Sequence, residues 1–393
     1  MKPAITKLFN DFFHSEKAGG FILIFCTVIS IWVTNSGMGA GYLDFWHMSV
    51  GFDMGILHLN HSLEYWINDG LMTIFFLLVG LEIERELYIG ELSTFKNASL
   101  PLFAAIGGMI APAVIHYAFN QGLETQSGFG IPMATDIAFA LGVLSLLGKR
   151  VPLTLKVFLA AFAIIDDLGA IIIIALFYTD HFSFLYFGLA MGLFGLLTLF
   201  NRLKINHSIA YILPGIMMWY CMLQSGVHAT ISGVMLAFAL PFGKGDERSI
   251  SYRWQHVLHK PVAFLILPLF ALANTCIEFA DGWHKQLFSP NSLGIMLGLL
   301  MGKPIGVMLF AFAAVKLKIS SLSEDISWHH LVTAGILGGI GFTMSVFITL
   351  LAFNEGAIVI ASKTAILLSS VVAGITGFIY HKVFAPRTTE PGE

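Results

Sequence analysis

The feature that most constrains this chain is a succession of about twelve apolar stretches, each near the roughly 20 residues that an α-helix needs to cross a bilayer. Charged residues make up only 11% of the chain, whereas a soluble protein has about 25%. The stretches are apolar on all sides, which favours helices over the alternating strands of a membrane barrel. The sequence therefore predicts an all-α polytopic membrane protein with spans near residues 18–34, 65–88, 99–119, 128–147, 153–178, 183–201, 208–221, 226–242, 257–276, 292–315, 330–352 and 357–383.

Composition argues against several other classes of protein. Cys26, Cys221 and Cys276 lie in or beside apolar stretches and are too few for a disulfide scaffold. The formal net charge of −3 provides no basic field for nucleic acid, and no histidine–cysteine spacing indicates a zinc site. We expect a membrane protein without a cofactor.

Basic residues divide the predicted joints between two faces of the membrane. Of the 21 Lys and Arg residues, only Lys285 lies on the face opposite to the others, and Lys303 and Lys363 lie within spans. Because cytoplasmic joints are enriched in Lys and Arg, both termini are expected in the cytoplasm. The longest external joint, residues 35–64, has neither residue type, and its glycine-separated, partly alternating halves fit a hairpin on the membrane surface or a plain loop.

Two aspartates stand side by side in the middle of the fifth span. Asp166 and Asp167 lie in the segment AAFAIIDDLGAIIIIAL, with apolar residues on both sides. A charged residue at the centre of a membrane helix costs about 2.5–3.5 kcal/mol, and such residues are typically functional. Adjacent residues point about 100° apart around a helix, so one can line a cavity while the other faces a neighbouring helix.

The fourth and eleventh spans contain features that interrupt helices. In the fourth, Pro132 lacks a backbone N–H, and Thr135 and Asp136 add a hydroxyl and a third carboxylate. In the eleventh, four glycines weaken the helix or serve close packing. These are Gly335, Gly338, Gly339 and Gly341. Two interrupted segments at corresponding positions in two halves of a chain indicate a transporter binding site.

A lysine inside the tenth span completes the set of buried charges. Lys303 lies beside Pro304, too deep in the span to reach the membrane surface. A buried ammonium group needs a carboxylate, and Asp166 or Asp167 is the natural partner. Carboxylates, a hydroxyl and freed carbonyls form a site of hard oxygen ligands that suits a small cation. Because protons compete for the same carboxylates, such a site can exchange a cation for protons.

A second group of charges lies at the predicted cytoplasmic end of the second span. Glu82, Arg85 and Glu86 have helical spacing in GLEIERELYIGE, and His256 and His259 begin the ninth span at the same face of the membrane. Histidine normally titrates between pH 5 and 8. The group therefore fits a proton-responsive mouth, or an ordinary charged helix end.

Several segments resemble the NhaA-type sodium/proton antiporters of bacterial inner membranes in order and spacing. They are WINDGLMTIFFLLVGLEIERE, LPLFAAIGGMIAPA, IPMATDIAFALGVLSLLGKRVPLTLKVFLAAFAIIDDLGAIIIIALFYT, SGVHATISGV, HVLHKPVAFLILPLFALAN, GKPIG and GILGGIGFTMSVFI. The resemblance implies a multi-pass inner-membrane antiporter that exchanges cytoplasmic Na⁺ or Li⁺ for external H⁺ and serves pH homeostasis and salt tolerance. It implies electrogenic, pH-regulated exchange by alternating access.

The resemblance also implies a fold. Spans three to five and ten to twelve, at about 99–178 and 292–383, would be inverted repeats with crossing, interrupted spans four and eleven. Residues 1–393 would form a single integral-membrane domain. Residues 45–60 within the external joint would form the contact of a homodimer.

Roles for individual residues follow from the same resemblance. Asp166 and Asp167 would bind Na⁺ or Li⁺ and protons, Lys303 would pair with Asp166, and Asp136 and Thr135 would balance helix ends. The pH-responsive cytoplasmic funnel would consist of Asp69, Glu82, Arg85, Glu86, His256 and His259. Two positions differ from the family pattern, since Glu84 stands where a basic residue is common and Gln255 where an acidic one is.

Three other functions fit parts of the sequence less well. An intramembrane aspartyl protease needs two carboxylates on different helices, such as Asp136 and Asp167, but the nearby lysine argues against it. Ser225 and His228 have the types of a hydrolase pair but no oxyanion-hole pattern. A channel needs a continuous wide pore, and nothing resembles a selectivity-filter repeat.

Overall fold

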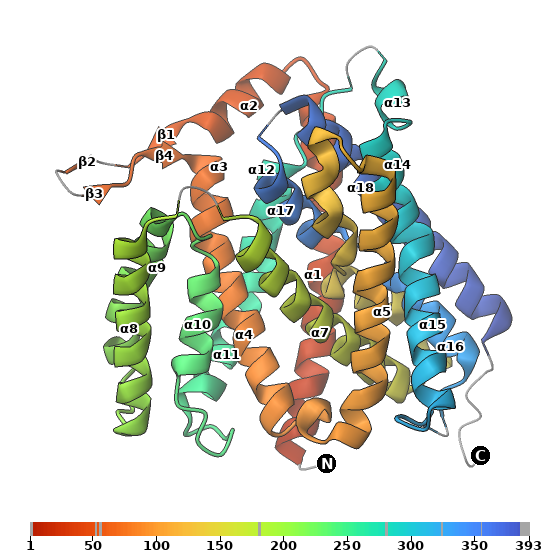
Figure 1. Ribbon diagram of the computed structural model, residues 1–393, viewed down its shortest axis with the longest axis horizontal. Coiled ribbons are helices and arrows are strands. Elements are labelled where there is room, and N and C mark those ends of the chain that lie inside the picture. The colour runs from red at the N-terminus through yellow and green to blue at the C-terminus, as the bar shows by residue number, and fades with distance from the viewer. Residues whose placement is uncertain are drawn as a thin grey trace. The chain divides into compact units, whose positions relative to one another are not determined.

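The computed structural model describes residues 3–51, 53–54, 57–179, 182–279, 282–323, 325–354 and 356–385, with the backbone alone for 3–17, 53–54, 57–58 and 149. In these ranges the regular structure is helical apart from four strands of two residues each. The predicted all-α polytopic fold is therefore confirmed (Figure 1).

The bounds of the elements are as follows. The α-helices are α1 (Pro3–Thr34), α2 (Gly39–His47), α3 (Leu63–Tyr65), α4 (Met72–Tyr88), α5 (Phe95–Asn120), α6 (Ile137–Leu146), α7 (Leu153–Phe177), α8 (Phe184–Arg202), α9 (Ser208–Ser225), α10 (Ile231–Ala239), α11 (Ile250–Pro261), α12 (Leu267–Asn274), α13 (Trp283–Gln286), α14 (Pro290–Leu297), α15 (Lys303–Lys316), α16 (Trp328–Gly338), α17 (Phe342–Ala352) and α18 (Gly356–Phe384). The 3₁₀ segments are η2 (Glu91–Ser93), η3 (Glu124–Met133) and η4 (Gly148–Arg150), and the π-helical segments are η1 (Trp66–Leu71), η5 (Val262–Ile266) and η6 (Gly298–Gly302).

The described residues contain seven helical stretches long and apolar enough to cross a membrane, and three bent pairs raise the total to ten. The pairs are α1 with α2, bent by 115°, and η3 with α6 and α16 with α17, each bent by 44°. The two remaining predicted spans correspond to α9, of 18 residues, and α10, of only 9. The count of twelve therefore stays a prediction.

The chain forms two compact units, and each is described by itself. Unit 1 comprises Met1–Phe21, Glu86–Ile173 and Ala280–Glu393, and unit 2 comprises Ile22–Arg85 and Ile174–Phe279. Unit 1 thus holds nearly all of the two predicted repeats. The inverted relation of the repeats and the single domain remain predictions.

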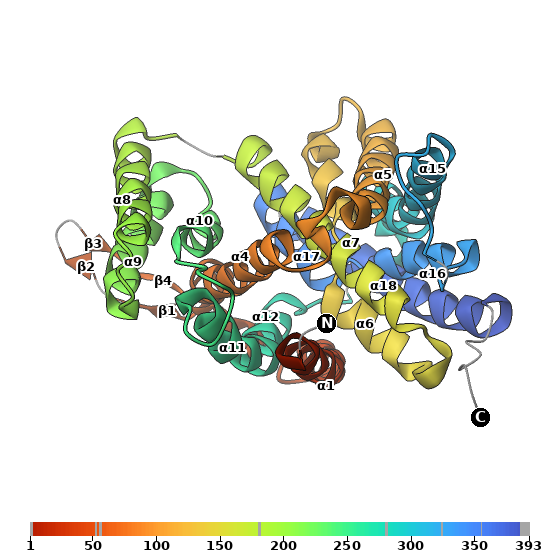
Figure 2. The same cartoon turned by 90° about the horizontal axis from the view of Figure 1, so that it is seen from below.

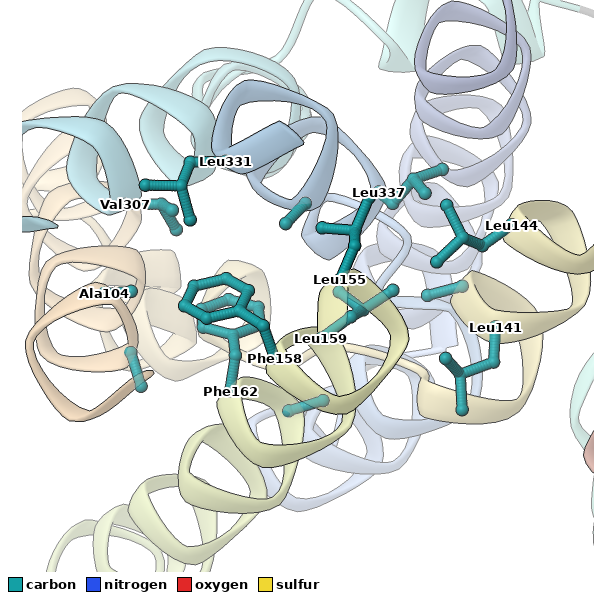
Figure 3. Packing of buried hydrophobic residues seen from close by; sticks show 14 of the residues in the cluster. Ala104, Leu141, Leu144, Leu155, Phe158, Leu159, Phe162, Val307, Leu331 and Leu337 are labelled. Carbon is teal, nitrogen blue, oxygen red and sulfur yellow. The ribbon is translucent and has the colours of Figure 1, made fainter. Parts of the chain in front are cut away.

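The core of unit 1 surrounds two aromatic rings on one face of α7. Phe158 and Phe162 lie one helical turn apart with nearly parallel rings, and Figure 3 shows them among Val307 of α15 and Leu331 and Leu337 of α16. All five side chains are buried. Since lipid is as apolar as these residues, close packing rather than removal from water stabilises this contact.

Glycine allows α5 and α15 to lie against each other, as Figures 1 and 2 show. A Cβ atom on Gly306 would meet the carbonyl oxygen of Gly107 at 2.0 Å, and one on Gly107 would meet the carbonyl oxygen of Gly306 at 2.2 Å. The two backbones are therefore in direct contact, as at other small-residue interfaces of membrane helices.

Unit 2 packs α8 beside α9 (Figure 2), with Leu197, Tyr211 and Met218 among its buried residues. The helix α10 approaches α4 closely, because a Cβ atom on Gly233 would meet the carbonyl oxygen of Thr73 at 2.2 Å. Small residues again set the distance between helices.

The predicted external joint forms a hairpin in unit 2. The strands β1 (Ser49–Val50) and β4 (His61–Ser62) pair antiparallel, as do β2 (Asp53–Met54) and β3 (Leu57–His58). The Trp66 indole N–H donates to the carbonyl of Val50 at 2.7 Å and so fixes the base of the hairpin to η1. Of the two alternatives for this joint, the structure has the hairpin.

Candidate functional site

The two interrupted segments of unit 1 meet at their breaks, between η3 and α6 and between α16 and α17. The backbone N–H of Asp136 donates to the carbonyl of Ile340 at 2.7 Å, and the Ser345 hydroxyl donates to the carbonyl of Ile131 at 2.7 Å. A broken helix in a membrane leaves backbone groups that lipid cannot satisfy. Here each break supplies partners to the other.

The residues expected to interrupt the helices lie at or beside these breaks. Gly338 ends α16, Gly339 caps it, and Gly341 precedes α17. A Cβ atom on Gly339 would meet the carbonyl oxygen of Leu299 at 2.4 Å, so this glycine permits close contact with η6. Pro132 lies inside η3, and the break follows two residues beyond it.

Asp136 is fully engaged by the ends of two helices. Its Oδ1 accepts the N–H of Phe139 at 3.0 Å and so caps α6, while its Oδ2 accepts the N–H and the hydroxyl of Thr343 at 3.1 and 2.6 Å. Helix N-termini carry partial positive charge, which a carboxylate balances. This geometry fits the balancing role, since both oxygens of Asp136 bond to helix ends.

Asp166 forms an ion pair with Lys303, and both side chains are fully buried. The Lys303 ammonium also donates to the carbonyl of Met133, just before the break. The Thr135 hydroxyl lies 2.7 Å from Asp166 Oδ2 and 2.8 Å from the carbonyl of Gly338, and its single proton serves one of them at a time. Lys303 and Thr135 thus contact the same carboxylate oxygen, and each of them also lies against a backbone carbonyl of an interrupted segment.

The other oxygen of this carboxylate is different. Asp166 Oδ1 is buried and has no hydrogen-bond partner among the described residues. Asp167, 2% exposed, lies close enough to Lys303 for an electrostatic interaction. The described residues contain no cluster of three acidic, histidine or cysteine side chains able to hold a metal ion. The site therefore presents the adjacent carboxylates of Asp166 and Asp167, with Asp136 beside them at the helix ends.

Local sequence explains the position of Lys303. It follows the π-helical segment η6 and precedes Pro304, which cannot donate a hydrogen bond to the preceding turn. Its Nζ atom lies 5.8 Å from the ring centre of Phe162 on α7. The widened turn directs the long side chain inward, where it meets Asp166.

In unit 2, the predicted funnel residues are only partly brought together. The Oε1 atom of Glu82 on α4 lies 3.9 Å from the Nδ1 atom of His259 on α11. Asp69 lies in the π-helical segment η1, where its backbone carbonyl accepts the indole N–H of Trp219 at 3.2 Å. His256 is exposed and stacks on Tyr252, with ring centres 6.4 Å apart.

Arg85 and Glu86 fall on opposite sides of the division between the two units. Within unit 1, Glu86 Oε2 accepts the backbone N–H of Glu91 at 3.0 Å. Burial, followed by the charge of Glu86, raises the pKa of Glu91 above its ordinary value. Arg85 ends the part of α4 that belongs to unit 2.

The structure adds residues that the sequence did not single out. Thr343 is a direct partner of Asp136, and Met133 is a direct partner of Lys303.

Glu84, one of the two positions that depart from the family pattern, is 3% exposed and accepts a hydrogen bond from the hydroxyl of Ser251 at 3.0 Å. Gln255 is buried on the same helix as Ser251.

The hydrolase alternatives find no support in this geometry. Both oxygens of Asp136 serve helix ends, so it does not share a proton with another aspartate. The Ser225 hydroxyl donates to the carbonyl of Met222 and accepts the N–H of Val227, which is a local turn.

Known proteins of one family resemble almost the whole chain. A family model described as Na+/H+ antiporter 1 matches residues 10–381. The Na(+)/H(+) antiporter NhaA 1 of Flavobacterium johnsoniae is 56% identical over 376 residues, covering 96% of this chain and 97% of its own. The NhaA antiporter of Cytophaga hutchinsonii is 56% identical over 379 residues, which cover 96% of each chain. The NhaA antiporter of Escherichia coli is 46% identical over 381 residues, which cover 96% of this chain and 98% of the relative. Proteins with these names are secondary transporters rather than enzymes, and the chain belongs to the Na⁺/H⁺ antiporter 1 family.

Proposed function

We propose that the protein exchanges cytoplasmic Na⁺ or Li⁺ for external protons at Asp166 and Asp167. One observation carries the assignment of the site: beside the second carboxylate, the buried Asp166 Oδ1 has no hydrogen-bond partner in the part of the chain that the structure describes. An unpartnered buried anionic oxygen is costly. A small cation or a proton removes that cost, so the two compete for the same atom.

The adjacent carboxylates explain why exchange would move net charge. A cation held by both aspartates requires both to be ionised, whereas the return step carries a proton on each. One cation then carries a single positive charge in one direction and two protons carry two charges in the other, so the membrane potential drives the exchange. Lys303 holds Asp166 in place between these states.

Alternating access would use the two breaks. The short helices on either side of each break are held by a few hydrogen bonds. Among them are the bond from the Asp136 N–H to the carbonyl of Ile340 and the bond from the Thr343 hydroxyl to Asp136. Movement of these half-helices can open the aspartates to one side at a time, as in other transporters with interrupted helices.

The protein would lie in the bacterial inner membrane with both termini in the cytoplasm. The one-sided distribution of Lys and Arg supports this orientation, with Lys285 as the exception. In this orientation the C-terminal end of α5 and the hairpin face outward, while Glu82 and His259 face the cytoplasm.

Regulation by pH would act through the cytoplasmic funnel. Glu82 and His259 would form the pH-responsive pair, since their 3.9 Å contact is an ion pair only when the histidine is protonated. Arg85, Glu86 and His256 would contribute charge around it, whereas Asp69 lies about 20 Å away, at the hairpin end of the same helical stretch. Glu84 and its partner Ser251 would shift the pH at which exchange begins relative to relatives with a basic residue there.

A homodimer would form through residues 45–60, of which 52, 55 and 56 lie outside the described residues. The hairpin supports this, since its short paired strands leave edges that a second copy could extend. Replacing residues 49–62 by a short glycine linker should convert a dimer to a monomer in light scattering of the detergent-solubilised protein. An unchanged mass would contradict the assignment.

The exchange itself is tested in inside-out membrane vesicles that contain an acid-sensing dye. After respiration acidifies the interior, addition of Na⁺ or Li⁺, but not K⁺, should release protons and restore fluorescence across about pH 6.5 to 8.5. The Asp167→Asn variant should abolish the response, with Asp246→Asn on an exposed turn as the matched control. Full exchange in Asp167→Asn would refute the site, and no response in the unaltered protein would refute the function.

A further inference from the structure

An aromatic ring lies beside the buried lysine of the candidate site. The Nζ atom of Lys303 lies over the ring of Phe162 on α7, 5.8 Å from the ring centre. Both side chains are fully buried. The face of an aromatic ring carries partial negative charge and attracts a cation within about 6 Å of its centre, most strongly where water is excluded. The ring of Phe162 is therefore an electrostatic partner of the Lys303 ammonium group.

Close packing fixes this ring in place. A Cβ atom on Gly108 of α5 would meet Phe162 Cε2 at 3.2 Å, and one on Gly338 of α16 would meet Phe162 Cε1 at 3.0 Å. The ring of Phe158 lies nearly parallel to it, with ring centres 6.4 Å apart, in the buried cluster that Figure 3 shows. A ring enclosed in this way cannot leave the ammonium group without displacing its neighbours.

The ring also lies at the break between α16 and α17. Gly338 ends α16, and its carbonyl oxygen lies 2.8 Å from the hydroxyl of Thr135. A Cβ atom on Gly338 would meet Cγ of Lys303 at 3.5 Å as well as the ring of Phe162. The ring, the lysine side chain and the end of α16 are thus in contact at one point, so a change in the ring acts on the candidate site through Lys303.

The charge that the ring faces depends on what the site holds. When Na⁺ is bound between two ionised aspartates, the negative charges of Asp166 and Asp167 balance those of the cation and of Lys303. When each aspartate carries a proton, the ammonium group is the only charge that these three residues retain. Its negative partners are then the carbonyl of Met133 and the face of the Phe162 ring.

The elements packed against the ring carry further charged residues and histidines near their ends. These are Lys96 and His116 on α5, Lys156 on α7, Lys316 on α15, and His329 and His330 on α16. Asp136, before α6, is bonded to helix ends. Since the proposed exchange changes the protonation of Asp166 and Asp167, it is the charge of this pair that distinguishes the two loaded states.

We propose that Phe162 is a positioning residue for the exchange: the face of its ring holds the Lys303 ammonium group in the site when both aspartates carry protons. The proposal rests on the proposed exchange at Asp166 and Asp167. An electron-rich ring face attracts the ammonium group and repels carboxylates, so it stabilises the proton-loaded state more than the cation-loaded state. Phe162 therefore strengthens the competition of protons against Na⁺.

The test replaces Phe162 by a trifluorinated phenylalanine, which nearly keeps the size of the ring and removes most of the negative charge of its face. The same replacement at Phe158 is the matched control, since this buried ring lies one turn away on the same face of α7. Both variants and the unaltered protein are reconstituted in liposomes. The KM for Na⁺ is measured at the acidic and the alkaline end of the pH range of the vesicle assay. The ratio of the acidic to the alkaline KM should fall by about threefold or more in the Phe162 variant and stay unchanged in the Phe158 variant.

A second measurement does not depend on transport. Na⁺ that binds the folded protein raises its unfolding temperature, and the concentration that gives half of this effect reports the affinity. At the acidic end of the range, this concentration should fall by about threefold or more in the Phe162 variant.

An unchanged or higher half-effect concentration in the Phe162 variant, or an unchanged KM ratio, would overturn the inference while the exchange stands. An equal fall in the Phe158 variant would overturn it as well, because packing rather than the charge of the ring face would then set the affinity. Absence of Na⁺ and Li⁺ exchange in the unaltered protein would instead refute the proposed function.

Discussion

The ammonium group of Lys303 and the Oδ2 atom of Asp166 form an ion pair in which neither side chain is exposed. Taking two charges out of water costs several kcal/mol each, and the pair recovers this only with further hydrogen bonds. Those come from the carbonyl of Met133 and the hydroxyl of Thr135. The stability of unit 1 and the state of the candidate site therefore depend on the same atoms.

Lys303→Met should lower the free energy of unfolding by about 3–5 kcal/mol, because it leaves the Asp166 carboxylate buried without its partner. The double variant Lys303→Met/Asp166→Asn should recover most of that loss, since no unpaired charge remains. Thermal unfolding in one detergent measures both. Lys316→Met, on an exposed lysine at the end of the same helix, is the control. A double variant no more stable than the single one would show that lost packing dominates.

Asp136→Asn should destabilise the protein more than Thr343→Val does. The first removes the negative charge that faces the N-terminal ends of α6 and α17, at about 1–3 kcal/mol. The second removes one hydroxyl donor and keeps the backbone bond, at about 1 kcal/mol. Chemical unfolding of the two variants gives the order. Equal losses would mean that the charge of Asp136 does not contribute.

The sequence predicted the elements of the site better than their connections. A buried lysine needs a carboxylate, so the pairing of Lys303 with one of the two aspartates followed from residue type alone, and the family resemblance selected Asp166. The bond from Thr343 to Asp136 joins residues 207 apart, and no local pattern reports such a contact. The sequence therefore predicted that Asp136 lies near the two other aspartates, but not which helix ends it bonds to.

In the fold, too, the sequence predicted the elements better than the contacts between them. Apolar length predicted the long helices, because membrane thickness fixes that length whatever the neighbours are. The helix α10 has only 9 residues, and its Gly233 packs closely against the backbone of α4. Hydropathy does not predict such a contact. Breaks were predicted from Pro132 and the glycines, but their mutual hydrogen bonds depend on how the two segments cross.

Gly306→Ala should lower the free energy of unfolding by about 1–3 kcal/mol, because the new methyl group would overlap the backbone of α5. Gly192→Ala on α8 is the matched control, since a Cβ atom there would meet nothing within 4 Å. Alanine favours helix more than glycine does, so the control should gain up to about 1 kcal/mol. Thermal unfolding of both variants decides, and equal effects would contradict the direct contact of α5 with α15.

Glu91 should make the protein less stable as pH rises. Burial and the charge of Glu86 raise the pKa of Glu91 in the folded state, so the unfolded chain loses the proton first. The penalty on the folded state is therefore absent below the ordinary glutamate pKa. It grows with pH until the raised pKa is passed and stays constant at higher pH. The effect is small, since this side chain is only half-buried.

Glu91→Gln removes this titration and can still accept from Asn97. The variant should match the unaltered protein in unfolding temperature at low pH and exceed it near neutral pH. Glu124→Gln, on an exposed residue of the same unit, should show no such divergence. If Glu91→Gln instead loses stability at neutral pH, the ionised carboxylate of Glu91 stabilises the folded state there. The combined effect of burial and of Glu86 on Glu91 would then be opposite in sign to the one derived from the structure.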